Sequence, residues 1–254
     1  MIYHVLNGDA LIDRFLATEL PGEPVVCREG FVEGSLAGDT LNDFFDSRIR
    51  FYSEFIDEDR ERYVGSVIQE FNKILSAPHH SEFNLWFGYD LFCRVNMFFI
   101  ISLLYDMEIE KEVYIVNPAH VKSEDIWKDF GRATVDDLGY CFSKRRHLNH
   151  KDLRHGNDLW FAYKNNDLSK LARLSQYKTE AYPYLEEVIR AHIDRFPKEG
   201  SEGRPEKTIR EIIRNGGKDF NSVFVEFFKR EGIYGFGDTQ VQKIYNKVVQ
   251  ELGY

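Results

Sequence analysis

Residues 82–105 read EFNLWFGYDLFCRVNMFFIISLLY, and the fold is decided here. The first part, Glu82–Phe87, is a short apolar run whose polar interior residue is Asn84, a pattern typical of a buried β-strand. The turn-forming residues Gly88-Tyr89-Asp90 separate this run from the apolar segment Leu91–Tyr105. That segment is shorter than the roughly 20 residues that span a membrane, so it predicts a buried helix directly after a buried strand.

The same order of strand, polar turn and helix recurs along the first part of the chain. Apolar runs predict further strands at Ile2–Leu6, Pro24–Cys27 and Glu112–Val116. Amphipathic patterns predict helical structure over residues 10–19 and 39–76. Strands that alternate with helices form βαβ units, so we expect an α/β fold with a mainly parallel sheet flanked by helices.

After residue 140 the sequence predicts helices and no strand. Three short final helices with tight turns are typical of a helix-turn-helix or winged-helix-like module. A stretch rich in Gly, Pro and charged residues precedes them at 197–205 and predicts a linker. We therefore divide the chain into an α/β domain (1–140), a helical connecting region (141–199) and a C-terminal module (200–254). The predicted helices are 152–164, 168–176, 184–196, 206–214, 221–230 and 239–252.

The charge distribution differs between these parts. Residues 1–140 carry 12 Lys and Arg against 26 Asp and Glu, whereas residues 141–254 carry 21 against 16. Residues 201–254 carry nine Lys and Arg against eight Asp and Glu, and so lack the cationic stripe that phosphate neutralisation needs. A nucleic-acid partner is therefore less favoured than a packing role or homo-oligomerisation.

The cysteines and the first residues indicate the compartment. Cys27, Cys93 and Cys141 are widely spaced, with no CxxC pair and no even disulfide set, which favours a reducing environment. The N-terminal residues read as a strand and not as a signal peptide. We expect a soluble, cytoplasmic protein with no membrane partner, in which the cysteines are buried and not nucleophilic.

Polar residues follow three of the predicted strands, as Asn7-Gly8-Asp9, Arg28-Glu29-Gly30 and Gly88-Tyr89-Asp90. In parallel α/β sheets, ligands bind beyond the carboxyl ends of the strands. If the strands are parallel, the three clusters lie on one rim of the sheet. Each Asp has an alternative role as a helix N-cap, and each Gly as a turn residue. The Arg-Glu pair caps no helix, which favours a shared site.

These clusters resemble the signature of a known family. His4–Asp9, Cys27-Arg28-Glu29 and Trp86–Cys93 with Asn96 are similar to the HxxNGD, CRE and WFxxDLFCxxN motifs of the bacterial domain-of-unknown-function 1835 family. The likeness covers roughly the first 140 residues, and the tail resembles the helical segment that often accompanies this domain. Relatives often carry Glu at the position of Gly88, which weakens the interpretation as a metal site. The resemblance implies a shared site and assigns no reaction to it.

The candidate catalytic residues are Asp9, Glu29 and Asp90, of which Glu29 or Asp90 would act as a base or cation ligand. We expect Arg28 to hold an anionic group, and Asn7 and Asp9 to orient the ligand. The ligand-binding candidates are His4, Asn7, Gly8, Arg28, Trp86, Tyr89 and Asn96.

Other motifs do not identify a cofactor or a metal site. The chain has neither a GxGxxG pattern after the first strand nor a GxxxxGK[ST] loop, so the cofactor stays unknown. His147, His150 and His155 lie in a basic stretch without the Cys pair that would complete a zinc site, and no metal ligand is predicted. His4 has an alternative interpretation as a hydrogen-bonded core histidine.

The sequence favours a site for a small, nucleotide-type or phosphate-bearing ligand on the rim, with hydrolysis as an open extension. The alternative is a non-enzymatic regulatory or adaptor protein whose C-terminal module binds DNA or protein. An enzyme should gather Asp9, Glu29 and Asp90 in one pocket. An adaptor should instead show a continuous basic or apolar patch on its last 110 residues.

Overall fold

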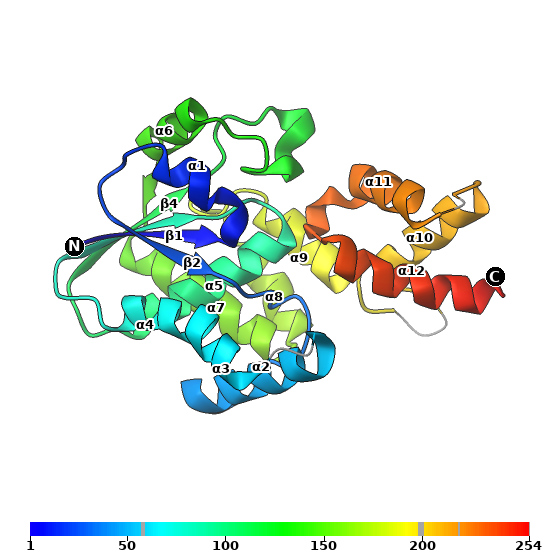
Figure 1. Cartoon of the computed structure of the whole chain (residues 1–254), viewed down its shortest axis with the longest axis horizontal. Coiled ribbons are helices and arrows are strands. Elements are labelled where there is room, and N and C mark those ends of the chain that lie inside the picture. The colour runs from blue at the N-terminus through cyan, green and yellow to red at the C-terminus, as the bar shows by residue number, and fades with distance from the viewer. Residues whose placement is uncertain (57–58, 198–200, 218, 254) are drawn as a thin grey trace.

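The chain forms a five-stranded sheet with the order β2-β1-β3-β4-β5 (Figure 1). A computed structural model describes residues 1–56, 59–197, 201–217 and 219–253. Strands β1 to β4 are parallel, and β5 is antiparallel to β4, which confirms the predicted α/β fold with a mainly parallel sheet. The strands are β1 (Ile2–Asn7), β2 (Glu23–Cys27), β3 (Ser81–Trp86), β4 (Lys111–Val116) and β5 (Arg146–His147).

Helices cover both faces of the sheet. On one face lie α1 (Ile12–Leu16) and α6 (Val135–Ser143), and on the other lie α4 (Gln69–Leu75), α5 (Leu91–Asp106) and α7 (His150–Lys164) (Figure 1). The remaining helices before the C-terminal module are α2 (Leu41–Ile56), α3 (Arg60–Tyr63), α8 (Leu168–Ser175) and α9 (Leu185–Ile193). Short segments are the 3-10 turns η1 (Asp9–Leu11) and η3 (Ser123–Lys128) and the π-helical η2 (Val64–Ile68).

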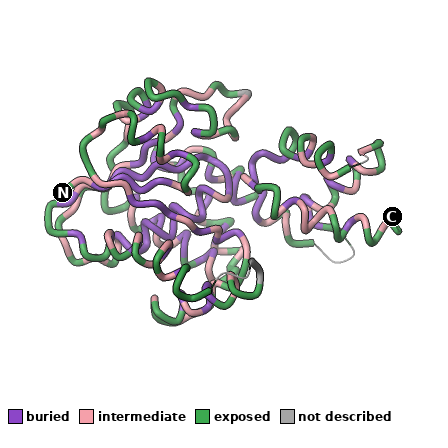
Figure 2. The backbone as a smooth tube through the Cα atoms, viewed as in Figure 1, coloured by how far each residue is buried: buried purple, intermediate pink, exposed green. Residues whose placement is uncertain are grey.

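Successive side chains of the strands enter two different hydrophobic cores. In β1, Val5 belongs to the larger core, which contains residues of α4, α5 and α7, and Leu6 belongs to the smaller core with residues of α1 and α6. Both side chains are fully buried, and Figure 2 shows buried backbone throughout the centre of the sheet. Burial on both faces explains why the strands read as continuous apolar runs and not as alternating ones.

The strand order reverses between β1 and β3. The chain passes from β1 to β2 on one side, returns through α2, α3 and α4, and continues with β3 on the other side of β1. Such a reversal is the topological switch point at which open α/β sheets bind ligands, beyond the carboxyl ends of the strands. Asn7 ends β1 at this point, and Phe87 follows the end of β3.

Helix α5 runs through the middle of the protein and begins at the switch point. Its N-cap is Asp90, whose side chain accepts a hydrogen bond from the backbone N–H of Cys93. From Leu91 to Leu104 nearly every residue is buried, as the apolar sequence predicts. No helix in the described ranges is long and apolar enough to cross a membrane.

The structure differs from the sequence-based expectation in three elements. Residues 10–19 form η1 followed by the short α1, and not one continuous helix. Helix α6 and the strand β5 were not predicted. β5 consists of two exposed residues, Arg146 and His147, so it has no apolar pattern to detect. It lies beyond residue 140, so the sheet continues into the region expected to be only helical.

The C-terminal module contains α10 (Arg204–Arg214), α11 (Phe220–Glu231), the 3-10 turn η4 (Gly232–Tyr234) and α12 (Asp238–Leu252). All three helices contact one another. None of the described residues after His147 lies in a strand, so the wing of a winged helix is not among them. Residues 198–200 of the predicted linker, which include the expected domain boundary, lie outside the described residues.

Candidate functional site

A cavity of about 330 Å³ lies beyond the carboxyl ends of β1 and β2. Its walls come from both strand ends, from α2, from the start of α5 and from the first turn of α12. We call it the rim cavity. It is lined by Asn7, Gly8, Cys27, Arg28, Glu29, Gly30, Glu33, Phe51, Tyr52, Phe92, Thr239 and Gln240. Four of the predicted site residues, Asn7, Gly8, Arg28 and Glu29, are therefore brought together.

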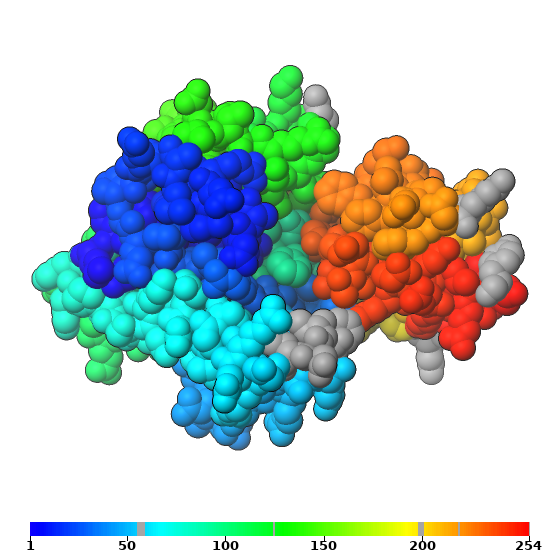
Figure 3. All heavy atoms as spheres, viewed as in Figure 1, coloured from blue at the N-terminus to red at the C-terminus, as the bar shows by residue number. Residues whose placement is uncertain are grey.

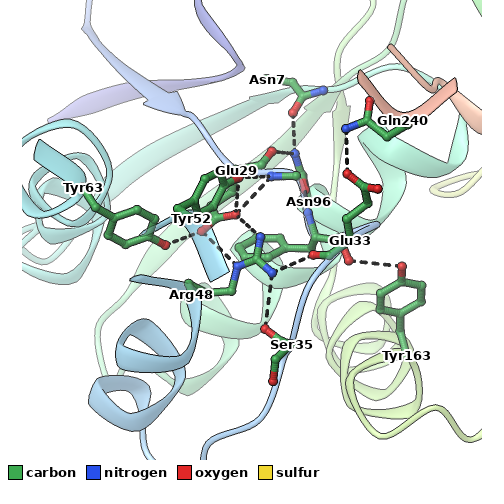
Figure 4. Close-up of polar contacts among 12 residues, drawn as sticks. Asn7, Glu29, Glu33, Ser35, Arg48, Tyr52, Tyr63, Asn96, Tyr163 and Gln240 are labelled. Atoms are coloured by element: carbon green, nitrogen blue, oxygen red, sulfur yellow. Dashed lines mark hydrogen bonds and ion pairs between the residues drawn. The ribbon is translucent and has the colours of Figure 1, made fainter. Parts of the chain in front are cut away.

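Asn7 is held in place by a chain of amide hydrogen bonds (Figure 4). Asn96 Nδ2 donates to Asn7 Oδ1 at 2.9 Å and to the backbone oxygen of Glu29 at 2.6 Å, and Asn96 Oδ1 accepts from Phe31 N at 3.2 Å. Asn96 is fully buried, so it acts through Asn7 and the backbone. The Asn7 Nδ2 group donates to Cys93 Sγ at 3.1 Å. These bonds fix the orientation of the Asn7 amide.

Asp9 forms an ion pair with Arg28, which lines the rim cavity. Arg28 Nε lies 2.9 Å from both carboxylate oxygens of Asp9, and Nη2 lies 2.8 Å from Oδ1. Arg28 Nη1 also donates to the backbone oxygen of Ser66 at 2.8 Å. The side chain of Asp9 is 60% exposed and that of Arg28 is 33% exposed. The hydrogen bond to Asp9 raises the pKa of Arg28, so the cation persists at any ordinary pH. Asp9 therefore neutralises the charge of Arg28.

Glu29 is not the free base that the sequence suggests. Its carboxylate is fully buried and lies 2.8 Å from Arg48 Nη2 in an ion pair (Figure 4). The hydroxyls of Tyr52 and Tyr63 also donate to it, Tyr52 at 3.1 Å. Burial and the neighbouring Glu29 charge raise the pKa of both tyrosines, which therefore remain hydrogen-bond donors. Glu29 therefore joins α2, through Arg48 and Tyr52, and α3, through Tyr63, to the end of β2.

The carboxylate of Asp90 lies away from the rim cavity. It caps α5 and belongs with Cys93 and Asp129 to a group whose ligand atoms all lie within 4.8 Å of one another. Burial and the neighbouring Asp129 carboxylate raise the pKa of Asp90 well above its ordinary value. Burial and the same carboxylates also raise the pKa of Cys93, so its thiol is not an activated nucleophile.

A second, smaller cavity of about 120 Å³ lies at the switch point itself. We call it the switch-point cavity. It is lined by Asn7, Ala10, Leu11, Arg14, Trp86, Gly88, Cys93, Asp129, Phe130 and Gly131. Asn7 lines both cavities. The loop that closes this cavity is held by Arg14 Nη1, which donates to the backbone oxygens of Phe130, Gly131 and Ala133.

His4 lies in the core and not on the rim. It is fully buried in the middle of β1, its Nδ1 accepts from Trp86 Nε1 at 3.1 Å, and its Nε2 lies 3.2 Å from the backbone oxygen of Pro21. Since Nδ1 accepts, Nε2 carries the proton, and the ring is neutral. Burial lowers the pKa of His4 accordingly. The alternative interpretation of a hydrogen-bonded core histidine describes this residue.

Trp86 and Tyr89 are also mainly structural. The Trp86 ring lies in the smaller core and contributes one edge to the switch-point cavity. Tyr89 is buried between the Arg94 guanidinium, 5.3 Å from its ring centre, and the Tyr184 ring. Burial raises the pKa of Tyr89 to about 12. Tyr89 lines neither of the two cavities.

The C-terminal module supplies one wall of the rim cavity. Gln240 Nε2 donates to Glu33 Oε2 at 3.0 Å, and Lys243 Nζ forms an ion pair with Glu33 Oε1 at 3.0 Å. Figure 3 shows the C-terminal helices beside the N-terminal segments, with a recess between them on the face shown. Thr239 and Gln240, in the first turn of α12, face the cavity. The rim site is therefore completed by residues far away in the sequence.

Several residues of the site were missed by the sequence analysis. Arg48 lies within an amphipathic helical run, where an arginine is normally interpreted as solvent-facing. Asp129 lies in a loop that carries no motif, and Gln240 lies at the start of a helix expected to belong to another module. Only the short spacing between Asp90 and Cys93 was visible in the sequence.

Comparisons with known proteins add no family to this geometry. No protein-family model, curated protein or solved structure significantly matches the chain. The geometry of the site is therefore the basis on which a function is inferred.

Proposed function

We propose that this chain is a small-molecule binding protein whose rim cavity takes a phosphate-bearing ligand with a planar ring. The observation that carries the proposal is the convergence of Asn7, Gly8 and Arg28 on one cavity at the carboxyl ends of adjacent parallel strands. The cavity volume of about 330 Å³ is within the range of small-ligand sites.

Arg28 supports binding of an anion. Its guanidinium has five N–H groups, and Asp9 and the Ser66 backbone oxygen accept from three of them. The Glu70 carboxylate also lies 4.0 Å from Arg28 Nη1, so a bound anion would compete with two acidic partners, of which Asp9 is the closer. Planar guanidinium donors match phosphate oxygens, and a third of the Arg28 side chain is exposed to receive them.

The aromatic lining supports a planar group on the ligand. Phe51, Tyr52 and Phe92 line the same cavity as Arg28, and the Gly30 position lies directly against the Phe92 ring. Aromatic side chains give a planar ring large contact area and favourable stacking or edge contacts. Gln240 and Thr239 add polar groups that can select among such rings.

The geometry supports binding more than hydrolysis. Among the residues that the structure describes as lining the rim cavity, Glu29 is present but Asp9 and Asp90 are absent. Glu29 is bound by Arg48 and two tyrosines, and Asp9 is bound by Arg28. A general base needs a carboxylate that reaches the reacting proton, and neither of these carboxylates is positioned for that.

A second candidate function is that of an adaptor that associates through its C-terminal module. Val225 and Phe228 on α11 are 54% and 37% exposed, which favours a protein contact. Arg204, Arg210 and Lys247 form ion pairs with carboxylates, which disfavours DNA. In this role the C-terminal module is a helix-turn-helix-like unit, in which α10, α11 and α12 contact one another. Sedimentation would show concentration-dependent association that Phe228→Ser abolishes, and a monomer at all concentrations would refute self-association.

The binding proposal is tested by calorimetric titration with inorganic phosphate, a phosphosugar and nucleoside monophosphates. We expect a nucleoside monophosphate to bind most tightly, because it uses both Arg28 and the aromatic lining. Arg28→Gln should weaken this binding at least tenfold, whereas Arg146→Gln, an exposed arginine paired with Glu180, should leave it unchanged. Asp9→Asn should tighten it, because a competing carboxylate is removed from Arg28.

Two results would contradict the proposal. One is that no phosphate compound gives a measurable heat of binding at millimolar concentration. The other is unchanged affinity in Arg28→Gln with the fold intact by circular dichroism. Weaker binding in Asp9→Asn would instead assign Asp9 a direct role in orienting the ligand.

A further inference from the structure

Three potential metal ligands meet beside the switch-point cavity. Asp90, Cys93 and Asp129 each offer one ligand atom, and these atoms all lie within 4.8 Å of one another. Asp90 and Cys93 are buried, and Asp129 is half-buried. The set combines two carboxylates with one sulfur, which is the donor mixture that borderline divalent ions such as Zn²⁺ accept and that Mg²⁺ or Ca²⁺ does not prefer.

Backbone groups hold both carboxylates in position through one oxygen of each, and the second oxygen of Asp129 accepts from the Cys93 thiol. Asp90 Oδ1 accepts from the backbone N–H of Cys93 at 2.8 Å, and Asp129 Oδ1 accepts from the backbone N–H of Tyr89 at 2.9 Å. Cys93 Sγ in turn accepts from the Asn7 amide at 3.1 Å. Such outer hydrogen bonds are typical partners of metal ligands, because they fix each ligand before the ion arrives.

The spacing between the sulfur and the oxygen fits a tetrahedral ion. Zn²⁺ takes a sulfur ligand at about 2.3 Å and a carboxylate oxygen at about 2.0 Å, so a tetrahedral angle separates the two ligand atoms by about 3.5 Å. The distance from Cys93 Sγ to Asp129 Oδ2 is 3.6 Å. The side chain of Asp129 reaches this position only because residue 88 is a glycine, since a Cβ there would lie 2.0 Å from its carboxyl carbon.

A buried cation balances the charge that such a site would carry. Arg94, next to Cys93 in the chain, is fully buried, and its Nε has no hydrogen-bond partner in the described part of the protein. Its other guanidinium nitrogens donate to Met97 Sδ at 3.6 Å and to the backbone oxygen of Pro183 at 3.1 Å, and neither of these partners is a carboxylate. Two carboxylates and a thiolate around a divalent ion carry one net negative charge, which the Arg94 guanidinium beside them offsets.

The switch-point cavity gives the site an open side. Cys93 and Asp129 line this cavity of about 120 Å³, which is large enough for water or a small ligand group. Structural zinc sites have four protein ligands, whereas catalytic ones have three and an open position. A set of three protein ligands, two of which face a cavity, matches the second arrangement.

We propose that Asp90, Cys93 and Asp129 bind one Zn²⁺-type divalent ion whose fourth coordination position faces the switch-point cavity. This site goes beyond ligand binding in the rim cavity and does not depend on it. Among the described residues, the switch-point cavity and the rim cavity share Asn7, whose amide donates to Cys93 Sγ.

The proposal is tested with Co²⁺, which reports a thiolate ligand by its sulfur-to-metal charge-transfer band. Protein freed of metals by a chelator and titrated with Co²⁺ should develop this band, with tetrahedral d–d absorption and one ion per chain. Zn²⁺ should displace the Co²⁺. Cys93→Ser should abolish the charge-transfer band, and Cys141→Ser, which removes another buried thiol, should retain it.

A second variant keeps the test decisive if Cys93→Ser does not fold. Asp129→Asn preserves the size of a half-buried loop residue and should weaken Co²⁺ binding at least tenfold while retaining the band at saturation. Arg28→Gln should bind Co²⁺ normally, so failure of the rim proposal and failure of the metal proposal are distinguishable. Absence of the band in the wild type, or its persistence in Cys93→Ser, would overturn the metal site.

Discussion

The Glu29 carboxylate lies 2.8 Å from the Arg48 guanidinium, and both side chains are fully shielded from solvent. Arg48 also donates to the backbone oxygens of Glu33 and Ser35, so one cation joins the end of β2, the following loop and α2 (Figure 4). This arrangement shapes the floor of the rim cavity. Because the Glu29–Arg48 pair is buried, removing one of its charges should change the free energy of unfolding.

Arg48→Met should lower the free energy of unfolding by about 3–5 kcal/mol, because the Glu29 carboxylate would remain buried without its cation. Adding Glu29→Gln should restore a large part of the loss, since an amide accepts from Tyr52 and Tyr63 without a buried charge. Urea denaturation measures both. Arg60→Met removes an exposed ion pair and should change stability by only about 0–1 kcal/mol. Equal effects of the two arginine variants would refute the assigned role of the pair.

Acid should destabilise the protein through buried histidines. His192 is buried against Tyr163, and neither of its ring nitrogens has a hydrogen-bond partner among the described residues. Burial, with a smaller effect of Arg195, lowers the pKa of His192 to about 3. As the pH falls, His192 is therefore protonated in the unfolded chain before it is protonated in the folded protein. The contribution of neutral His192 to the free energy of unfolding is complete above pH about 6.5 and is lost as the pH falls toward 3.

The matched variant is His192→Phe, which keeps an aromatic ring and removes the titrating group. The difference in free energy of unfolding, variant minus wild type, should increase by about 1.4 kcal/mol for each pH unit below about 6.5. Exposed His79→Phe should give no such divergence. Parallel pH profiles of wild type and His192→Phe would show that His192 does not titrate on unfolding.

Gly235 marks the contact between the C-terminal module and the start of α5. It has φ of +62°, and a Cβ at this position would lie 2.1 Å from Asp90 Oδ1. Gly235→Ala therefore combines backbone strain with a clash against a buried side chain. Gly216→Ala shares the positive φ, at +102°, but meets no atom within 4 Å. Gly235→Ala should be about 1–3 kcal/mol less stable than Gly216→Ala by thermal unfolding. Equal melting temperatures would contradict this contact.

Much of the architecture was predictable because its signals are local. The apolar runs of β1, β3 and β4 and the buried helix α5 are visible in the sequence, since burial on both faces of a parallel sheet demands continuous apolar residues. Short elements with exposed residues were not predictable. β5 consists of Arg146 and His147, which carry no periodicity and form a strand only because β4 offers an unpaired edge.

The sequence by itself determined that Asn7, Arg28 and Asp90 lie at or just beyond strand ends, because turn residues and apolar runs mark those ends directly. Only the tertiary structure decided which side chains meet there. Arg48 neutralises Glu29, Asp129 joins Asp90 and Cys93, and Gln240 closes the rim cavity from a distance of more than 200 residues in the chain. Residue patterns reflect the burial of each element, whereas contacts between elements depend on how the crossovers and helices pack, which periodicity does not encode.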